Sequence, residues 1–171
     1  MSEPTISELI YPVKLDNRHR GQLAELAFMR KAASLGFAVA KPYGEGERYD
    51  IVVCVDNVFW RVQVKSVLAK SPSRPYYRVK TSGGSGQRGH TSYSASEIDF
   101  LVAYIFQEDV WYVFPATVIE NRTALCVMPG SKRSRFEQYR EAWKLMRPTV
   151  ADSKTAADNS AGTAAAAVAG S

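Results

Sequence analysis

The feature that most constrains the fold of this chain is the stretch of residues 49–66, YDIVVCVDNVFWRVQVKS. Two runs rich in β-branched and aromatic residues flank Asp56-Asn57, a pair that tolerates the positive φ angles of a two-residue hairpin turn. The stretch therefore predicts two antiparallel strands joined by a tight turn. Counting back from that turn places Asp50 directly opposite Gln63, on the same face of the hairpin.

The second strand of this hairpin alternates between an apolar and a polar face. The polar face carries Arg61, Gln63 and Lys65. Exposure of one face to solvent would explain the pattern without any function. The predicted register adds a second interpretation, in which Asp50, Gln63 and Lys65 converge at one end of the hairpin. They would then form a small group of oxygen ligands with an amine beside it.

The charge balance of the chain fits a polyanionic partner. Among 171 residues, 22 Lys and Arg outnumber 17 Asp and Glu, which gives a net charge of +5. This excess fits nucleic acid, although many basic proteins bind none. The two cysteines show no CxxC spacing, which gives no indication of zinc and fits a cytoplasmic protein. The longest apolar runs, such as FLVAYIF, are too short to span a bilayer, so no membrane partner is expected.

The order of the predicted elements indicates a mixed central β-sheet flanked by helices, in the α/β or α+β class. Apolar spacing predicts helices over residues 20–35, 94–99 and 134–146, and strands over 37–43 (ended by Pro42), 49–55, 58–68, 76–81, 100–106 and 110–116. Residues 82–92 are rich in Gly and Ser and predict a mobile loop.

One domain is expected over residues 18–148, with the last predicted helix included. Residues 1–17 are interpreted as an irregular N-terminal lead-in. Residues 149–171, rich in Ala, Gly and Ser, are interpreted as a disordered tail because they contain no large side chain to bury.

Glu25 adds a second carboxylate to the candidate site. It lies in the predicted helix over residues 20–35, among apolar neighbours such as Leu26 and Phe28. A carboxylate in such surroundings must reach water, a partner or a cation, because its desolvation is costly. Pairing with Lys31 or with an arginine is the alternative to a functional role.

Four residues and their surroundings carry a family resemblance: Glu25 in GQLAELAFMRKAASLGF, Asp50 in RYDIVV, and Gln63 with Lys65 in VQVKS. In these motifs the chain resembles the PD-(D/E)XK nucleases, which share the restriction-endonuclease-like fold. It is most similar to the branch with Holliday-junction resolvases and a group I intron homing endonuclease. The resemblance spans residues 18–119 and includes YSASEIDFLVAYIFQEDVWYVFPA.

The resemblance implies a Mg²⁺-dependent DNA endonuclease, with Mn²⁺ as a substitute ion. Asp50 would be the main anionic ligand and Glu25 a second one, directly or through water. Gln63 would be a neutral ligand where most members have Asp or Glu, although the intron-endonuclease branch also has glutamine there. Lys65 would orient the attacking water or stabilise the charge on the phosphate. Tyr49 stands where the motif name has proline.

DNA, duplex or branched, is the expected partner. Dimers and tetramers are frequent in the family, so a homodimer or homotetramer is also expected. The candidate nucleic-acid contacts, all basic, are Arg61, Arg88, Lys132, Arg133 and Arg135. The alternative function is a catalytically inactive nucleic-acid-binding module with the same fold, which the neutral Gln63 leaves open.

Overall fold

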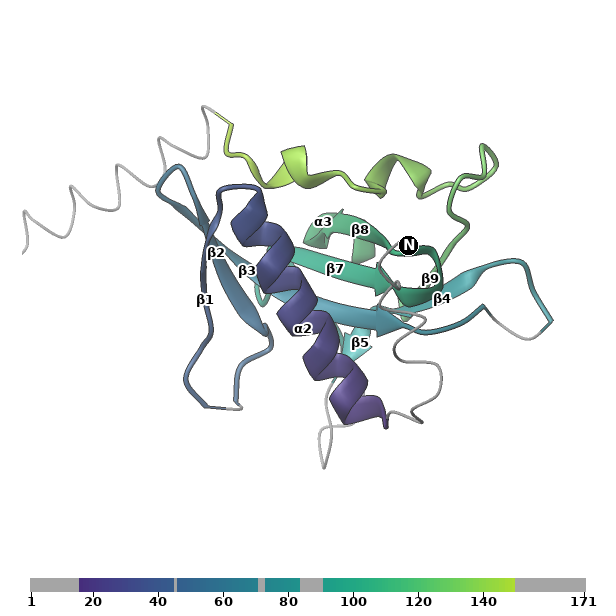
Figure 1. The fold of residues 1–171 in the computed structure, drawn as a ribbon, viewed down its shortest axis with the longest axis horizontal. Helices are drawn as coiled ribbons and strands as arrows, with labels where there is room; N and C mark the ends of the chain where they lie inside the picture. Colours follow the sequence, from purple (N-terminus) through teal and green to yellow (C-terminus); the bar gives the residue numbers. More distant parts are fainter. Residues whose placement is uncertain (1–15, 45, 71–72, 84–90, 150–171) are drawn as a thin grey trace, which may run out of the picture.

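A five-stranded mixed sheet forms the centre of a computed structural model that describes residues 16–44, 46–70, 73–83 and 91–149. The strands follow the order β1-β2-β3-β7-β8 (Figure 1). Their bounds are Ala38–Ala40 for β1, Ile51–Val55 for β2, Val58–Val67 for β3, Phe100–Ile105 for β7 and Val110–Pro115 for β8. β3 and β7 are parallel, and the other neighbours are antiparallel. The predicted mixed sheet is therefore confirmed.

The β2–β3 hairpin has the predicted turn and register. Asp56 and Asn57 adopt φ angles of 49° and 64°, the left-handed geometry that a two-residue hairpin turn requires. The Asp50 N–H donates to the Val62 carbonyl at 2.9 Å, which continues the pairing one residue beyond the start of β2. Asp50 therefore lies opposite Gln63, as predicted.

Helix α2 (Asn17–Ser34) covers one face of the sheet (Figure 1). The Asp16 side chain caps its first turn by accepting the His19 N–H at 2.8 Å. Gly36 follows its end with a φ of 81°, a conformation that favours glycine. The helix predicted over residues 20–35 is confirmed and begins three residues earlier. Its buried residues are Ala24, Phe28 and Ala32.

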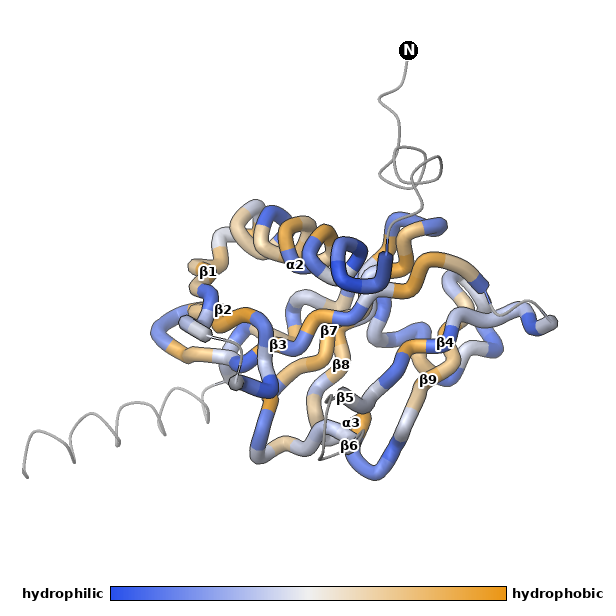
Figure 2. Tube along the Cα trace, turned by 90° about the horizontal axis from the view of Figure 1, so that it is seen from below, coloured by the Kyte–Doolittle hydropathy of each residue, from blue (hydrophilic) through white to orange (hydrophobic). Residues whose placement is uncertain are grey.

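Smaller elements cover the opposite face of the sheet (Figure 2). Their bounds are Tyr77–Lys80 for β4, Ser82–Gly83 for β5, Thr91–Ser92 for β6, Ala116–Ile119 for α3 and Ala124–Val127 for β9. β4 pairs with β9, and β5 with β6. Hydrophobic residues concentrate in the central strands (orange in Figure 2) and form a buried cluster on each face. The sequence did not predict α3 and β9, because four residues are too few to show the repeat of apolar residues that marks a helix or a strand.

The helix predicted over residues 94–99 is wrong. Its residues form a single turn, closed by the Ile98 N–H donating to the Ser94 carbonyl at 3.1 Å. The Glu97 carboxylate accepts the Ser94 N–H at 3.0 Å and so caps this turn. The two ends of the loop predicted over residues 82–92 pair as strands β5 and β6, which the sequence did not predict, and residues 84–90 lie outside the described residues.

The helix predicted over residues 134–146 is wrong as well. The segment contains two short 3₁₀-helices, Glu137–Tyr139 and Trp143–Met146, with Glu141 between them at a φ of 48°. The Glu141 N–H donates to the Trp111 carbonyl at 2.8 Å, and the Glu141 carboxylate accepts the Trp111 N–H at 2.8 Å. Hydrogen bonds to the edge strand β8 thus replace those of a continuous helix.

The ends of the domain stay predictions. Of the lead-in and the tail, the structure describes only residues 16–17 and 149, and the rest lies outside the described residues. Within the described ranges, none of the helices combines the length and the apolar character needed to cross a membrane.

We expect Glu141→Ala to lower the free energy of unfolding by about 2 kcal/mol, because the Trp111 N–H and the Trp143 indole N–H both lose their acceptor. Glu141→Gln keeps one side-chain oxygen and should lose less. Urea denaturation followed by tryptophan fluorescence measures the difference. Glu47→Ala, at an exposed position before β2, is the matched control and should change stability by less than about 0.5 kcal/mol. Wild-type stability of Glu141→Ala would contradict this anchoring role.

Candidate active site

The candidate site forms where β3 runs beyond its partner strand. β2 begins at Ile51, whereas β3 continues to Val67 and pairs there only with β7. Asp50, the residue before β2, reaches across the uncovered edge, and its Oδ2 accepts the Val64 N–H at 2.8 Å. This end of the hairpin therefore presents backbone and polar side chains at a position that a longer β2 would cover.

Asp50 is a partly buried acid without an ion-pair partner. Its Oδ2 accepts hydrogen bonds from the Val64 N–H and from the Gln63 amide. Burial and, to a smaller extent, the Glu25 carboxylate raise the pKa of Asp50, and the hydrogen bond from the Val64 N–H lowers it; the net result is a pKa of about 6. No ion pair with Asp50 occurs among the residues that the structure describes. A cation at this carboxylate would therefore be stabilised.

Gln63 is only 6% exposed, so solvent exposure does not explain a polar residue at this position. Its Nε2 donates to the Asp50 carboxylate and to the Val64 carbonyl, the latter at 3.2 Å. Two oxygens thus converge on the Gln63 amide. If the amide presents Oε1 there instead of Nε2, three oxygens meet, and a cation between them would satisfy all three.

Glu25 reaches the same site from α2. Glu25 and Asp50 line the same cavity, and the Glu25 charge contributes to the raised pKa of Asp50. Glu25 Oε2 forms an ion pair with Lys41 Nζ at 2.7 Å, and this hydrogen bond raises the pKa of Lys41. The partner is therefore Lys41, which follows β1. Lys31, the partner expected for a purely structural role, pairs with Glu141 instead.

Lys65 lies beside the two carboxylates and is held by Tyr93. Its Nζ donates to the Tyr93 hydroxyl at 2.9 Å and lies 5.0 Å from the ring centre. Burial lowers the pKa of Lys65, and attraction to Asp50 opposes this effect. Burial also raises the pKa of Tyr93 to about 12, so the hydroxyl stays protonated at neutral pH. In the described ranges Lys65 forms no ion pair, and its charge is available to a ligand.

Arg48 fixes Tyr93 from the face of the ring. Its guanidinium carbon lies 4.4 Å from the ring centre, and its N–H groups donate to Glu97 and to the Gly83 and Thr91 carbonyls at 2.9–3.1 Å. Gly83 makes room for the hydroxyl, because a Cβ there would collide with it. Sequence reasoning did not identify Tyr93 or Arg48 as site residues. Arg48 directly precedes the hairpin, but its contact with Tyr93, and that of Tyr93 with Lys65, join residues far apart in the sequence that no local pattern connects.

A cavity of about 800 Å³ opens over these side chains. Its walls are the N-terminal half of α2, the uncovered part of β3, β4 and β5. A second cavity of about 410 Å³ adjoins it, since Glu25 and Asp50 line both. The charged residues that line the larger cavity are Arg20, Glu25, Asp50, Lys65, Arg78 and Lys80.

The donors at this site fit a hard divalent cation. The Asp50 and Glu25 carboxylates, the Gln63 amide and the Val64 carbonyl supply oxygens, which Mg²⁺ prefers. The described residues contain no group of three or more His, Cys, Asp or Glu side chains that could hold a metal, and the site has only two carboxylates. It therefore suits an ion that keeps several waters better than it suits zinc.

Arg61, expected to face solvent or phosphate, is bound within the fold. Its guanidinium pairs with the Asp99 carboxylate at 2.9 and 3.1 Å and donates to the Ser96 carbonyl at 2.6 Å. The same carboxylate accepts the Arg61 backbone N–H at 2.7 Å. Arg61 does not line the cavity. The pair instead fastens β3 to the turn that precedes β7.

The other predicted nucleic-acid contacts lie apart from the cavity or outside the described residues. Lys132, Arg133 and Arg135 are exposed, and none of them lines the cavity. Arg88 lies outside the described residues. The structure thus brings Glu25, Asp50, Gln63 and Lys65 together, but not the predicted basic residues.

The chain is similar to known proteins along most of its length. The PD-(D/E)XK endonuclease family model matches residues 15–146. Protein 5.3 of Escherichia phage T7 is 28% identical over 119 residues, which cover 69% of this chain and 97% of the phage protein. The structure of a bacterial homing endonuclease, I-Ssp6803I, is similar with a TM-score of 0.69 and 31% identity, over 77% of this chain and 93% of that chain.

We expect the metal-free Asp50→Asn variant to be more stable than wild type at about pH 8, by about 2 kcal/mol. Both hydrogen bonds of Asp50 go to one oxygen, which the asparagine keeps, while the buried charge is removed. The folded-state pKa of Asp50, about 6, exceeds its ordinary value of 3.8, so its ionisation lowers stability as pH rises between these values. The difference in stability between the variant and the wild type should vanish at pH ~4, where the folded wild type has Asp50 protonated. Urea denaturation in EDTA at both pH values measures it, and a variant less stable at the higher pH would contradict the expectation.

Proposed function

Since the chain belongs to the PD-(D/E)XK endonuclease family, we propose that it is a metal-dependent DNA endonuclease that hydrolyses phosphodiester bonds. The observation that carries the proposal is the convergence of Glu25, Asp50, Gln63 and Lys65 on one cavity. Phosphodiester hydrolysis requires stabilisation of negative charge on the phosphate and an activated water. Carboxylates that can hold a cation, next to a half-buried lysine, meet both requirements.

Asp50 and Glu25 would hold the cation, together with Oε1 of Gln63 and the Val64 carbonyl. Mg²⁺ is the proposed ion and Mn²⁺ its substitute, because both accept hard oxygen ligands. When bound, the ion lowers the pKa of a water and neutralises charge on the scissile phosphate. Gln63 contributes no charge, so this ligand set attracts the ion less strongly than one with glutamate at the same position.

Lys65 acts on the phosphate and on the attacking water. Its ammonium group has two N–H bonds besides the one that it donates to Tyr93. One of them can donate to a phosphate oxygen, where negative charge develops, and the other can orient the water. Arg48 and Gly83 keep the Tyr93 ring in place, and so keep Lys65 aimed at the cavity.

Lys41 competes with the cation for Glu25. The 2.7 Å ion pair uses only Oε2 of Glu25, so Glu25 can coordinate through its other oxygen while the pair stays closed, or through Oε2 once the pair opens. The Lys41 side chain is 56% exposed, so it can turn toward solvent or toward a phosphate at little cost.

The alternative is a catalytically inactive nucleic-acid-binding module with the same fold. The neutral Gln63 and the Glu25–Lys41 ion pair favour it, because both reduce the negative charge that a cation meets. The Lys65 ammonium favours the endonuclease, because it lies beside the carboxylates with a neutral hydroxyl as its partner. DNA, duplex or branched, is the proposed substrate, and a homodimer or homotetramer is the proposed assembly.

Cleavage assays test the proposal. We expect the protein to cut supercoiled, linear or four-way-junction DNA with Mg²⁺ or Mn²⁺ and not with EDTA. Asp50→Asn and Lys65→Ala should each slow cleavage by about 100-fold or more, because charge stabilisation is lost, while DNA binding is largely retained. Lys144→Ala, at an exposed position, is the control and should cleave normally. Cleavage at the wild-type rate by either site variant would overturn the assignment. DNA binding without cleavage under all conditions would favour the inactive module.

Gln63 is tested by metal affinity. We expect Gln63→Glu to bind Mg²⁺ or Mn²⁺ about tenfold more tightly, because it adds a negative charge beside Asp50. Gln63→Leu removes the oxygen at similar volume and should stay folded but bind metal weakly. Calorimetric titration of both ions into the three proteins measures the affinities, and circular dichroism checks the fold. Equal affinities would remove Gln63 from the ligand set.

A further inference from the structure

β4 presents two basic side chains to the active-site cavity. Its residues alternate in burial: Tyr77 and Val79 are buried, and Arg78 and Lys80 are exposed. Because alternate residues of a strand share a face, Arg78 and Lys80 point the same way, about 7 Å apart along the strand. Both line the cavity that contains the candidate catalytic residues.

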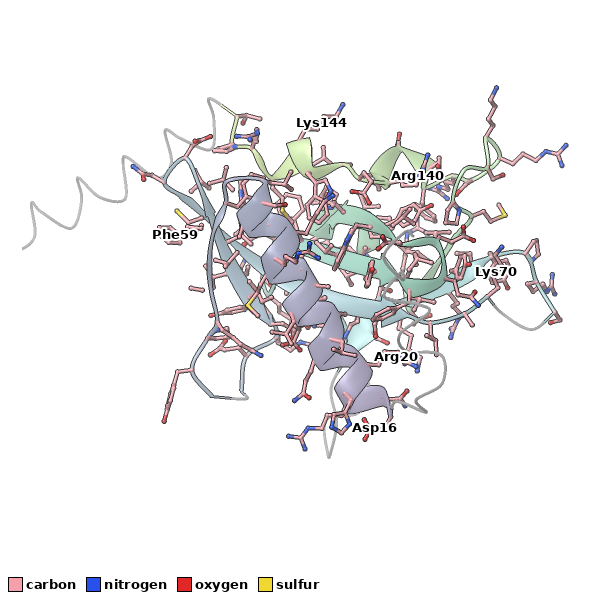
Figure 3. All side chains as sticks on the ribbon, in the orientation of Figure 1. Asp16, Arg20, Phe59, Lys70, Arg140 and Lys144 are labelled. Carbon is pink, nitrogen blue, oxygen red and sulfur yellow. The ribbon has the colours of Figure 1, made fainter. Side chains whose placement is uncertain are left out.

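Arg20 adds a third positive charge from the N-terminal turns of α2 (Figure 3). Its Nε donates to Ser66 Oγ at 3.3 Å, and its Nη2 donates to Asn17 Oδ1 at 3.0 Å. Both acceptors are neutral, so these contacts hold the guanidinium at the cavity wall without cancelling its charge. We refer to Arg20, Arg78 and Lys80 as the basic ridge.

No acid neutralises the basic ridge within the part of the chain that the structure describes. Across the β4–β9 pair, Arg78 faces Cys126 and Lys80 faces Ala124, which are small and uncharged. By contrast, Lys70 before β4 is paired with Glu108. The ridge is therefore an uncompensated positive surface on the cavity wall, which suits an anionic ligand.

We propose that the basic ridge binds backbone phosphates of the DNA strand that enters the active site. This inference rests on the proposed endonuclease function and names the residues that hold its substrate. The strand needs such contacts, because Glu25 and Asp50 repel phosphates until a cation is bound. Side chains about 7 Å apart can each bind a different phosphate, since phosphates follow one another every ~3.4 Å along the axis in each strand.

The ridge contacts carry no sequence information, because phosphates are the same at every base. They fix the position of the backbone relative to Lys65 and strengthen binding of all sequences alike. The ridge is also separate from the C-terminal basic residues Lys132, Arg133 and Arg135, which do not line the cavity.

The salt dependence of DNA binding tests the inference without cleavage. A fluorescent duplex is titrated in EDTA with the Asp50→Asn protein as parent. The ridge variant adds Arg78→Gln and Lys80→Gln. The matched control adds Arg30→Gln and Lys144→Gln, which removes the same two charges from exposed positions outside the cavity. A second control, Arg78→Lys with Lys80→Arg, keeps both charges.

We expect the ridge variant to reduce the slope of log affinity against log salt by about two, because two counterion-releasing contacts are lost. The matched control and the charge-preserving exchange should keep the parent slope. An unchanged slope in the ridge variant, or an equal reduction in the matched control, would overturn the inference. If either contrary result is found but the wild-type protein cleaves DNA, only the ridge is rejected. If it neither binds nor cleaves any DNA tested, the endonuclease proposal and the ridge are both rejected.

Discussion

The contacts of Asp50, Gln63 and Lys65 in the candidate site depend on the register of the β2–β3 hairpin. Because side chains alternate along a strand, a shift of one residue would turn Gln63 and Lys65 to the face that α2 covers, and would move Asp50 away from both. The positive φ angles of Asp56 and Asn57 set the register locally. The alternating aliphatic residues of both strands favour the same register, since only this register places them all on the buried face. A short turn thus determines which side chains meet at the opposite end of the hairpin.

The candidate site differs from an ordinary ion pair in how its charges are satisfied. Burial raises the pKa of Asp50 and lowers that of Lys65, so the folded chain disfavours the charged form of each. In the Arg61–Asp99 pair, by contrast, each charge meets its partner through several hydrogen bonds. The first arrangement weakens the fold, and the hydrophobic clusters on both faces of the sheet offset it. Such a cost is expected where charges are arranged for a ligand.

The sequence predicts well what neighbouring residues decide. The hairpin depends on a two-residue turn and on strand alternation, which are both local. The helix expected over residues 134–146 fails because its apolar spacing also suits two short turns lying on β8. The contact that decides between them joins Glu141 to Trp111, 30 residues away. Likewise, Tyr93 reaches Lys65 across 28 residues, and nothing in the spacing of either residue indicates the contact.

Gly83 has no side chain, yet it constrains Lys65. The Tyr93 hydroxyl occupies the volume that a Cβ at Gly83 would need, and the same hydroxyl accepts the hydrogen bond from Lys65. A lineage that keeps the hydroxyl must therefore keep the glycine, whereas a lineage that loses the hydroxyl can accept alanine. The two positions should therefore covary among relatives. A side chain at position 83 would then mark the descendants that have lost the tyrosine–lysine contact.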